Sequence, residues 1–205
     1  MFDTTEKRER SLGTKLFLKA HRCNSPKCVS VRQQARPGAH GASRRGAKSE
    51  FGQQLNEKQK IRFSYGLREA QMRKVFETAS KNVGITGNMI TQILESRLDN
   101  VIFRLGLAPS RSVARQLINH GHIMVNGKKV TIPSYSAKVG DKLSIRPQSK
   151  DHIEFKNLAE TLKKHNPPVW LSLDADKMEG KMIAKAADPD FPFDVNMVVD
   201  FYSKQ

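Results

Sequence analysis

Apolar positions between residues 57 and 81 recur at the spacing of an amphipathic helix. Their side chains share one arc of about 100°: Ile61, Tyr65, Met72, Val75, Phe76 and Ala79. Gly66 interrupts this pattern, and because glycine is a poor helix former we expect two helices there. A second helical pattern covers residues 89–105, after a predicted turn at 82–88, and Gly106 ends it.

The stretch from Ser110 to Val130 changes from helical to alternating periodicity. Ser110 is a suitable N-cap, residues 111–120 carry one apolar helical face, and Gly121 suits a left-handed stop. The run HIMVNGKKVTI then alternates, and its Asn126-Gly127 pair is a strong hairpin signal. Because KLSIRP supplies another strand, residues 95–147 are predicted to fold as two helices against a small antiparallel sheet.

The remaining segments are less regular. Residues 4–20 fit a short helix, IEFKNLAETLKKH fits another, and VWLSLD and MVVDFY alternate like short strands. Residues 22–50 are rich in Gly, Pro, Ser, Ala and Arg and have no apolar period, so they cannot bury enough surface to fold alone. We interpret them as an arm that becomes ordered on its partner, with a flexible linker as the alternative.

Together these patterns predict an α+β fold. It consists of a mostly helical lobe plus a small inserted helix–hairpin–sheet module, preceded by a basic extended arm. The predicted boundaries are 1–47 for the arm, 48–94 with 151–205 for the lobe, and 95–150 for the module.

The chain is strongly basic, with a formal net charge of +16 and a pI near 10.1. Residues 1–150 hold 29 Lys and Arg against 10 Asp and Glu, whereas residues 151–205 hold 7 against 10. This favours a nucleic-acid partner for the first three quarters of the chain. A membrane partner is not expected, because no apolar run approaches the roughly 18–20 residues that span a bilayer. The first residues lack an apolar signal core and there are only two cysteines, which favours a soluble cytoplasmic protein.

Five cations of the 95–147 region are predicted to converge on one side: Arg97, Arg104, Arg111, Arg115 and Lys128. Guanidinium forks match phosphate oxygens, so arginines stacked on one helical stripe suit a nucleic-acid backbone. For any single arginine a solvated surface position is the simpler interpretation, but the set favours RNA or DNA. Further candidates come from the arm and from the helix at 57–81: Arg44, Arg45, Lys58, Lys60 and Arg62.

The run RLDNVIFRLGLAPSRSVARQLINHGHIMVNGKKVTIPSYSAKVGDKLSIRP closely resembles the small RNA-binding module named after small-subunit ribosomal protein four. RPGAHG, FGQQLNEKQKIRFSYGLRE, PPVWLSLD and MVVDFYSK resemble the bacterial ribosomal protein family itself, in the same order. The resemblance implies a structural constituent of the small ribosomal subunit in the cytoplasm. It implies a primary binder of 16S rRNA that nucleates assembly of the subunit body and contributes to translational accuracy. The implied neighbours are small-subunit proteins five and twelve, and mRNA where it enters the ribosome.

Carried over to this chain, the resemblance implies an RNA-binding face made of Arg97, Arg104, Ser110, Arg111, Arg115, Gln116, His120, Asn126 and Lys128. The cations would bind phosphates, while Ser110, Gln116 and Asn126 would reach ribose or base edges. For Asn126 and His120, a purely structural position in a turn and at a helix end is an equal alternative.

Two other functions use the same module. A stand-alone RNA-binding factor is the first, although such chains are short and lack these flanks. An RNA-modifying enzyme is the second, because SRLDN is similar to the Arg-Leu-Asp core of pseudouridine synthases, whose Asp attacks the uridine. Asp99, however, lies inside the module's own first helix, where pairing with an arginine or with backbone amides is expected. We therefore predict no catalytic residues and no enzyme.

The two cysteines form half of a possible zinc site, because HRCNSPKC places Cys23 and Cys28 five positions apart. Some members of the resembled family add a second cysteine pair nearer the N-terminus, but residues 1–22 contain no cysteine. His21 and His40 lie at spacings that fit no known pattern. We predict no metal and no other cofactor, and we name Cys23 and Cys28 as the residues that zinc would use.

Overall fold

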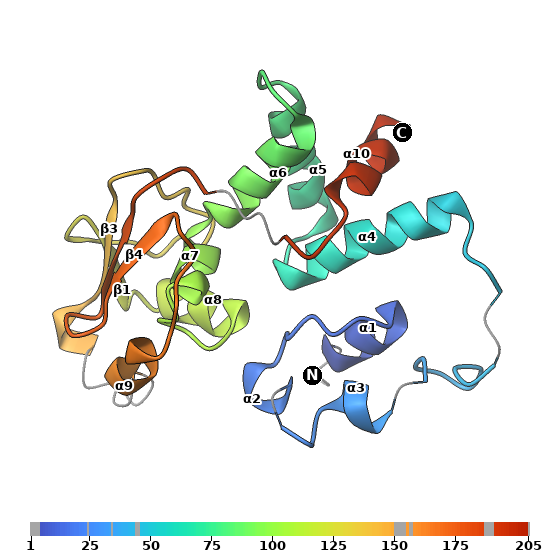
Figure 1. Cartoon of the computed structure of the whole chain (residues 1–205), viewed down its shortest axis with the longest axis horizontal. Helices are drawn as coiled ribbons and strands as arrows, with labels where there is room; N and C mark the ends of the chain where they lie inside the picture. The colour runs from blue at the N-terminus through green and yellow to red at the C-terminus, as the bar shows by residue number, and fades with distance from the viewer. Residues whose placement is uncertain are drawn as a thin grey trace. The chain divides into compact units, whose positions relative to one another are not determined.

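The structure is a computed structural model, which describes residues 5–23, 25–33, 35–43, 46–149, 155, 158–186 and 191–204. The chain splits into two compact units (Figure 1). Unit 1 comprises Met1–Ile90 and Phe191–Gln205, and unit 2 comprises Thr91–Asp190. In the described part of the chain, no helix is long and apolar enough to span a membrane.

Unit 1 is helical in its described part. Its elements are α1 (Thr5–Leu12), α2 (Ala20–Cys23), α3 (Val29–Arg32), α4 (Glu50–Ser64), α5 (Glu69–Ser80), the start of α6 (Thr86–Glu95) and α10 (Val195–Ser203). The predicted break at Gly66 is confirmed: α4 ends two residues earlier, and Gly66 adopts a left-handed φ of 60°. The Ser49 hydroxyl caps α4 by accepting a hydrogen bond from the Gly52 backbone N–H.

The C-terminal segment is a helix, so the strand predicted for MVVDFY is wrong. Asp194 caps α10 by accepting hydrogen bonds from two backbone N–H groups of its first turn. The buried residues Val198, Phe201 and Tyr202 follow the three- and four-residue spacing of a helix. Because a six-residue segment is too short to distinguish the two periods, its pattern alone could not decide between strand and helix.

The arm is more ordered than its composition suggested. The short helix expected within residues 4–20 is present as α1, which packs against α3 and α4, and α2 and α3 are the order that the prediction lacked. Leu12, Leu16, Cys23 and Cys28 are buried within the arm. Two of these helices are only four residues long, which is too short to leave a periodic signal in the sequence.

Unit 2 packs helices against a five-stranded sheet. Its elements are α7 (Leu98–Arg104), α8 (Arg111–Asn119), β1 (Ile123–Val125), β2 (Lys128–Lys129), β3 (Lys142–Ile145), the 3-10 turn η1 (Pro147–Ser149), α9 (Leu158–Lys163), β4 (Leu171–Asp174) and β5 (Glu179–Met182). The strand order is β2-β1-β3-β5-β4, and all neighbouring strands are antiparallel. The predicted hairpin is confirmed, with φ values of 50° at Asn126 and 77° at Gly127. The chain therefore has the expected α+β fold.

The last two strands extend unit 2 beyond the predicted boundary at residue 150. β5 pairs with β3 and places Gly180 opposite Leu143. A Cβ at Gly180 would lie 2.4 Å from a methyl carbon of Leu105, so this close approach of strand and helix requires glycine. Residues 158–186 thus pack with the module rather than with the helical lobe. β1 pairs with one edge of β3, and the other edge is paired by β5, which is distant in sequence.

Two helices, α6 and α7, replace the single helix predicted over 89–105. Between them Arg97 is extended, with φ −64° and ψ 138°, and it forms an isolated bridge with Ser136. α6 also begins at Thr86, inside the predicted turn at 82–88. As a result Arg97 becomes the N-cap residue of α7, and its side chain can fold back onto the first turn of that helix.

Candidate nucleic-acid interface

The helices α7 and α8 pack against each other within unit 2 (Figure 1). Their apolar sides belong to the core of the unit, in which Val101, Ile102, Ala114 and Ile118 are fully buried. α8 begins where predicted, because the Ser110 hydroxyl accepts a hydrogen bond from the Val113 backbone N–H at 3.3 Å. The arginines of both helices lie outside this apolar contact.

Two of these arginines share one buried carboxylate. Arg97 donates from Nε to Asp99 Oδ1 at 3.1 Å and from Nη2 to Oδ2 at 2.8 Å. Arg115 of α8 donates from Nε and from Nη2 to Oδ2, at 3.2 and 2.6 Å. Asp99 is 2% exposed and lies in the first turn of α7, where the helix dipole also favours a negative charge. One anion therefore holds a cation from the N-cap of α7 and another from the middle of α8.

A second buried carboxylate, that of Glu95, holds the other two arginines. Arg104 donates from Nε and Nη2 to the two oxygens of Glu95, at 3.0 and 3.2 Å. The amide of Asn100 donates to Glu95 Oε2 at 2.8 Å and accepts from Arg111 Nε at 2.7 Å, so it links Arg111 to the carboxylate. The Arg111 guanidinium also lies 4.6 Å from the centre of the Phe103 ring, within cation–π distance.

These contacts form what we term the arginine network: Glu95, Arg97, Asp99, Asn100, Arg104, Arg111 and Arg115. It consists of two groups, one around Asp99 and one around Glu95, which between them hold four of the five predicted cations; that these cations share one RNA-binding face stays a prediction. Four guanidinium groups against two carboxylates leave a net charge of +2. The side chains of Arg97, Arg104 and Arg115 are 12%, 25% and 31% exposed, whereas both carboxylates are almost fully buried. The network thus presents cations outward and keeps its anions inside.

The other residues predicted to contact RNA differ in their exposure and in the hydrogen bonds that they already make. Gln116 is exposed on α8, His120 is exposed at its C-cap, and Lys128 is exposed on β2. Ser110 is only 4% exposed, and its hydroxyl contacts the Ser112 hydroxyl at 3.0 Å besides capping α8. The predicted RNA contacts of these residues stay predictions, with Ser110 the least accessible.

Asn126 has a clear structural role in the hairpin. Its amide donates to Asp141 Oδ1 at 2.8 Å, and its amide oxygen accepts from the Lys142 backbone N–H at 2.9 Å. These bonds tie the β1–β2 turn to the start of β3. The turn alternative for this residue is therefore supported, while an RNA contact by Asn126 stays untested.

Lys58 is poorly placed for the RNA contact predicted for it, which stays untested. Its residue is 5% exposed, its Nζ donates to Glu69 Oε1 at 2.8 Å, and it lies 4.2 Å from the centre of the Phe201 ring. The helical pattern placed Lys58 beside the apolar stripe, where it would be solvated. The local helical pattern could not show that α10, from the far end of the chain, covers this position.

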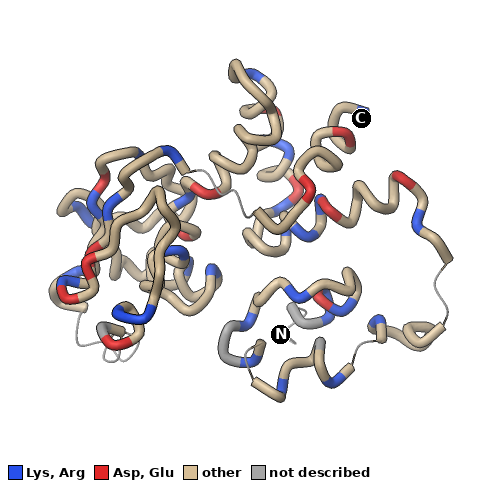
Figure 2. Tube along the Cα trace, in the orientation of Figure 1, with Lys and Arg blue, Asp and Glu red and all other residues tan. Residues whose placement is uncertain are grey.

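The other cations predicted outside unit 2 are less fully buried. Lys60 pairs with Glu57 one turn earlier in α4, and Arg62 donates to Glu69 Oε2 at 3.0 Å with a side chain that is 24% exposed. Arg44 and Arg45 lie outside the described residues. Figure 2 shows Lys and Arg recurring along α1 to α4 as well as in unit 2.

Glu69 is the centre of a second charged group, the Glu69 cluster, which consists of Lys58, Arg62, Glu69 and Tyr202. The Tyr202 hydroxyl of α10 donates to Glu69 Oε1 at 2.9 Å. Burial alone would raise the pKa of Glu69, but the hydrogen bonds from Lys58 and Tyr202 outweigh it and lower that pKa. Burial and the bond to this carboxylate raise the pKa of Tyr202 far above its ordinary value.

The contacts of Asp99 bear on the enzyme alternative. A nucleophilic carboxylate must reach its substrate, yet Asp99 is 2% exposed and both of its oxygens accept hydrogen bonds from arginines. The expected pairing of Asp99 with a nearby arginine is confirmed. Its geometry fits a structural anion rather than an attacking group.

Cys23 and Cys28 are both buried in the arm, and burial raises the pKa of the Cys23 thiol. Among the residues that the structure describes, no three His, Cys, Asp or Glu side chains are grouped as a metal ion would require. The side chain of His21 lies outside the described part. That the chain takes no zinc stays a prediction.

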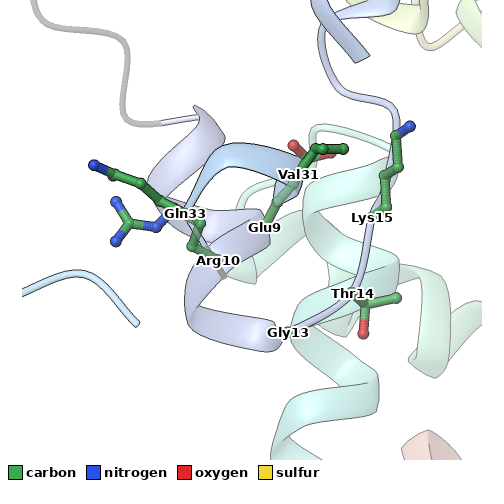
Figure 3. Close-up of a pocket in the computed structure, with 7 residues that line it drawn as sticks. All are labelled: Glu9, Arg10, Gly13, Thr14, Lys15, Val31 and Gln33. Atoms are coloured by element: carbon green, nitrogen blue, oxygen red, sulfur yellow. The ribbon is translucent and has the colours of Figure 1, made fainter. Parts of the chain in front are cut away.

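An open hollow in the arm is lined by residues of α1, the following turn and α3 (Figure 3). Glu9, which lines it, is 2% exposed and accepts hydrogen bonds from the backbone N–H groups of Leu16 and Leu18, at 2.9 and 3.2 Å. This carboxylate therefore fixes the chain that follows α1. The hollow carries no arrangement of groups that indicates a ligand.

Comparison with known proteins finds matches to both parts of the chain. The family described as "S4 domain" matches residues 96–143, and that described as "Ribosomal protein S4/S9 N-terminal domain" matches residues 3–95. Small ribosomal subunit protein uS4 of Acetivibrio thermocellus is 48% identical over 197 residues, which cover 95% of this chain and 94% of the relative. The relatives from Alkaliphilus oremlandii (uS4A, 47%) and Halothermothrix orenii (uS4, 46%) align over the same shares.

Proposed function

Because the chain belongs to the uS4 family of small ribosomal subunit proteins, we propose that it is a primary binder of 16S rRNA that nucleates assembly of the subunit body. As a member of this family it is a structural, RNA-binding component of the ribosome and not an enzyme. The observation that carries the finer proposal is a match over 95% of the chain, which includes the flanking segments as well as the RNA-binding module.

The arginine network supports this proposal on physical grounds. Folded RNA is recognised mostly through its shape, its phosphates and its 2′-hydroxyl groups. Arginine forks suit such a target because they meet phosphate oxygens in pairs. The four arginines of the network offer contacts to phosphates. Exposed Gln116 on α8 and exposed Lys128 on the hairpin add contacts to ribose and phosphate from the same module.

We extend the proposal to the surroundings of the bound protein. Small-subunit proteins five and twelve are its neighbours, it lies near the mRNA where the message enters the ribosome, and it contributes to translational accuracy in the cytoplasm. The less basic segment after residue 150 suits protein contacts better than RNA contacts, since it holds fewer Lys and Arg than Asp and Glu.

The test is binding of the full chain to a transcript of the 5′ domain of 16S rRNA. We expect tight binding that weakens steeply with salt, by about 0.7–0.9 log units per log unit of salt for each phosphate contact. An unrelated structured RNA of the same length is the control. A flat salt response, or equal affinity for both transcripts, would contradict the proposal. Crosslinking in cells followed by sequencing should recover small-subunit rRNA rather than tRNA or mRNA alone.

A further inference from the structure

We propose that Asp99 is a positioning residue, which holds Arg97 and Arg115 in the geometry that RNA phosphates require before the RNA arrives. Glu95, through Asn100, does the same for Arg104 and Arg111. This inference rests on the proposed function, because it explains how that same face would bind RNA. It assigns to two buried anions a role in binding a polyanion.

The first support is the geometry of the bonds. Arg97 and Arg115 come from the N-cap of α7 and the middle of α8, yet each is held to Asp99 through its Nε and Nη2 atoms. Arg97 meets both oxygens of the carboxylate, which fixes the plane of its guanidinium as well as its position, while Arg115 directs both of its donors to Oδ2. A long side chain that is already fixed loses less conformational freedom when it binds. Asp99 thus orients the guanidinium groups of both Arg97 and Arg115 before RNA binds.

The second support is the distribution of burial. The carboxylates of Asp99 and Glu95 are 2% and 0% exposed, whereas the arginine side chains reach 31%. An approaching phosphate therefore meets guanidinium groups and not carboxylates. A guanidinium is planar and carries five N–H donors, which is the geometry that binds phosphate oxygens in pairs.

The third support is that folding alone does not call for this arrangement. Replacing a buried ion pair by apolar residues of similar volume is often neutral or stabilising, and exposed ion pairs contribute little to stability. The positions of Asp99 and Asn100 adjoin the apolar core, where Leu98 and Val101 are fully buried. Charged groups in such a place are better explained by the orientation they impose on the arginines than by stability.

The main test compares two substitutions that each raise the net charge by one. Asp176→Asn removes an 84% exposed carboxylate of unit 2, and Asp99→Asn removes the buried one. Long-range charge alone predicts that both variants bind the 16S transcript as well as the unmodified protein or slightly better. Positioning predicts that Asp99→Asn binds about tenfold more weakly in spite of its added positive charge, because two side chains must then be immobilised on binding.

A second readout examines the free protein. In the unmodified chain the Nε–H groups of Arg97, Arg115 and Arg104 should give distinct, slowly exchanging NMR signals, because each is bonded to a carboxylate. Asp99→Asn should remove this protection from Arg97 and Arg115 but leave it at Arg104, which Glu95 holds. A purely structural role of Asp99 would not give this selective change together with a weakened RNA complex.

Thermal unfolding shows whether the Asp99→Asn variant folds. If it does not, Arg115→Lys keeps the charge but loses the two-bond fork, and Arg146→Lys is the matched control in the same unit. We then expect a several-fold loss of rRNA affinity for Arg115→Lys only. If Asp99→Asn, or Arg115→Lys in its place, binds as tightly as its control, the positioning role is refuted while the rRNA-binding function stands. If the unmodified chain shows no preference for the 16S transcript, the proposed function fails first.

Discussion

Glu69 in unit 1 and Asp99 in unit 2 each bind two basic side chains, but with opposite burial. In the Glu69 cluster the Lys58 side chain is 7% exposed and the carboxylate of Glu69 is 44% exposed. In the arginine network the carboxylate of Asp99 is 2% exposed and the Arg115 side chain is 31% exposed. A cation can face RNA where its counterion lies beneath it, and it cannot where it is itself the covered member of the pair.

The two regions also use different cations. Lysine is a compact point charge, and Lys58 is enclosed by Glu69 and by the rings of Phe201 and Tyr202 from α10, which its ammonium approaches to 4.2 and 5.7 Å. This arrangement attaches the C-terminal helix to α4 and α5. The arginines of unit 2 instead offer planar forks, which suit bidentate contacts. The comparison therefore separates a cation that is covered within the fold from the cations that we propose bind RNA.

The largest expected effect tests the structural side of this comparison. Glu69→Ala removes the counterion of buried Lys58 and the acceptor of Tyr202, so we expect unit 1 to lose about 3 kcal/mol of stability. Thermal and denaturant unfolding would measure this loss. Glu77→Ala, an exposed position on the same helix, is the control. Equal stability of the two variants would show that the Glu69 cluster does not hold α10.

The next largest effect is expected at Asn126 of the hairpin, for which the sequence allowed either a role in the turn or a contact with RNA. Asn126→Ala forces a left-handed φ of 50° on alanine and removes two hydrogen bonds, which we expect to cost about 2 kcal/mol. Asn126→Gly keeps the backbone conformation and should cost about half as much. The rRNA affinity of the folded variants should stay unchanged. If affinity falls while stability holds, Asn126 contacts RNA.

Local features of this chain were predictable from its sequence. The Asn126-Gly127 turn, the break at Gly66 and the Ser110 cap depend on the residue itself and its immediate neighbours, and the structure has all three. The spacing of Arg97 and Arg104 indicated one stripe of a single helix, but Arg97 precedes α7, and it is the pairing with Asp99 and Glu95 that positions these arginines. Resemblance to a family supplied the function that these local signals could not name.

Contacts between distant segments were not predictable in the same way. Nothing in the helical pattern of residues 57–81 shows that α10 covers Lys58, and nothing near residue 143 shows that β5 pairs with β3. The buried carboxylate that links Arg97 to Arg115 was foreseen only as a pairing with some arginine. The spatial partner of a charged residue, not its own identity, decides whether it stabilises the fold or is available for binding.

A smaller effect tests the binding side of the comparison at an exposed lysine. Lys128→Ala on β2 should weaken binding of the 16S transcript three- to fivefold and reduce the salt slope by about 0.7–0.9, because one phosphate contact is lost. Its unfolding temperature should not change, since the side chain is exposed. Lys185→Ala, another exposed lysine of unit 2, removes the same charge. Equal losses in both variants would indicate general attraction rather than a contact at Lys128.

The smallest expected effect is a dependence of unit 1 stability on pH. Although burial opposes it, hydrogen bonds from Lys58 and Tyr202 hold the pKa of Glu69 below its ordinary value of 4.5. A carboxyl with a lowered folded-state pKa stabilises the fold above that ordinary value and loses this contribution as the pH falls through the folded-state pKa. The difference in unfolding temperature between the unmodified protein and Glu69→Gln should therefore be full at pH 7 and shrink below about pH 4.5. The corresponding difference for Glu77→Gln should change little over the same range. A constant Glu69→Gln difference down to pH 3 would mean that the ionised carboxylate does not hold Lys58 and α10. The Glu69 cluster would then not be the stabilising counterpart of the arginine network.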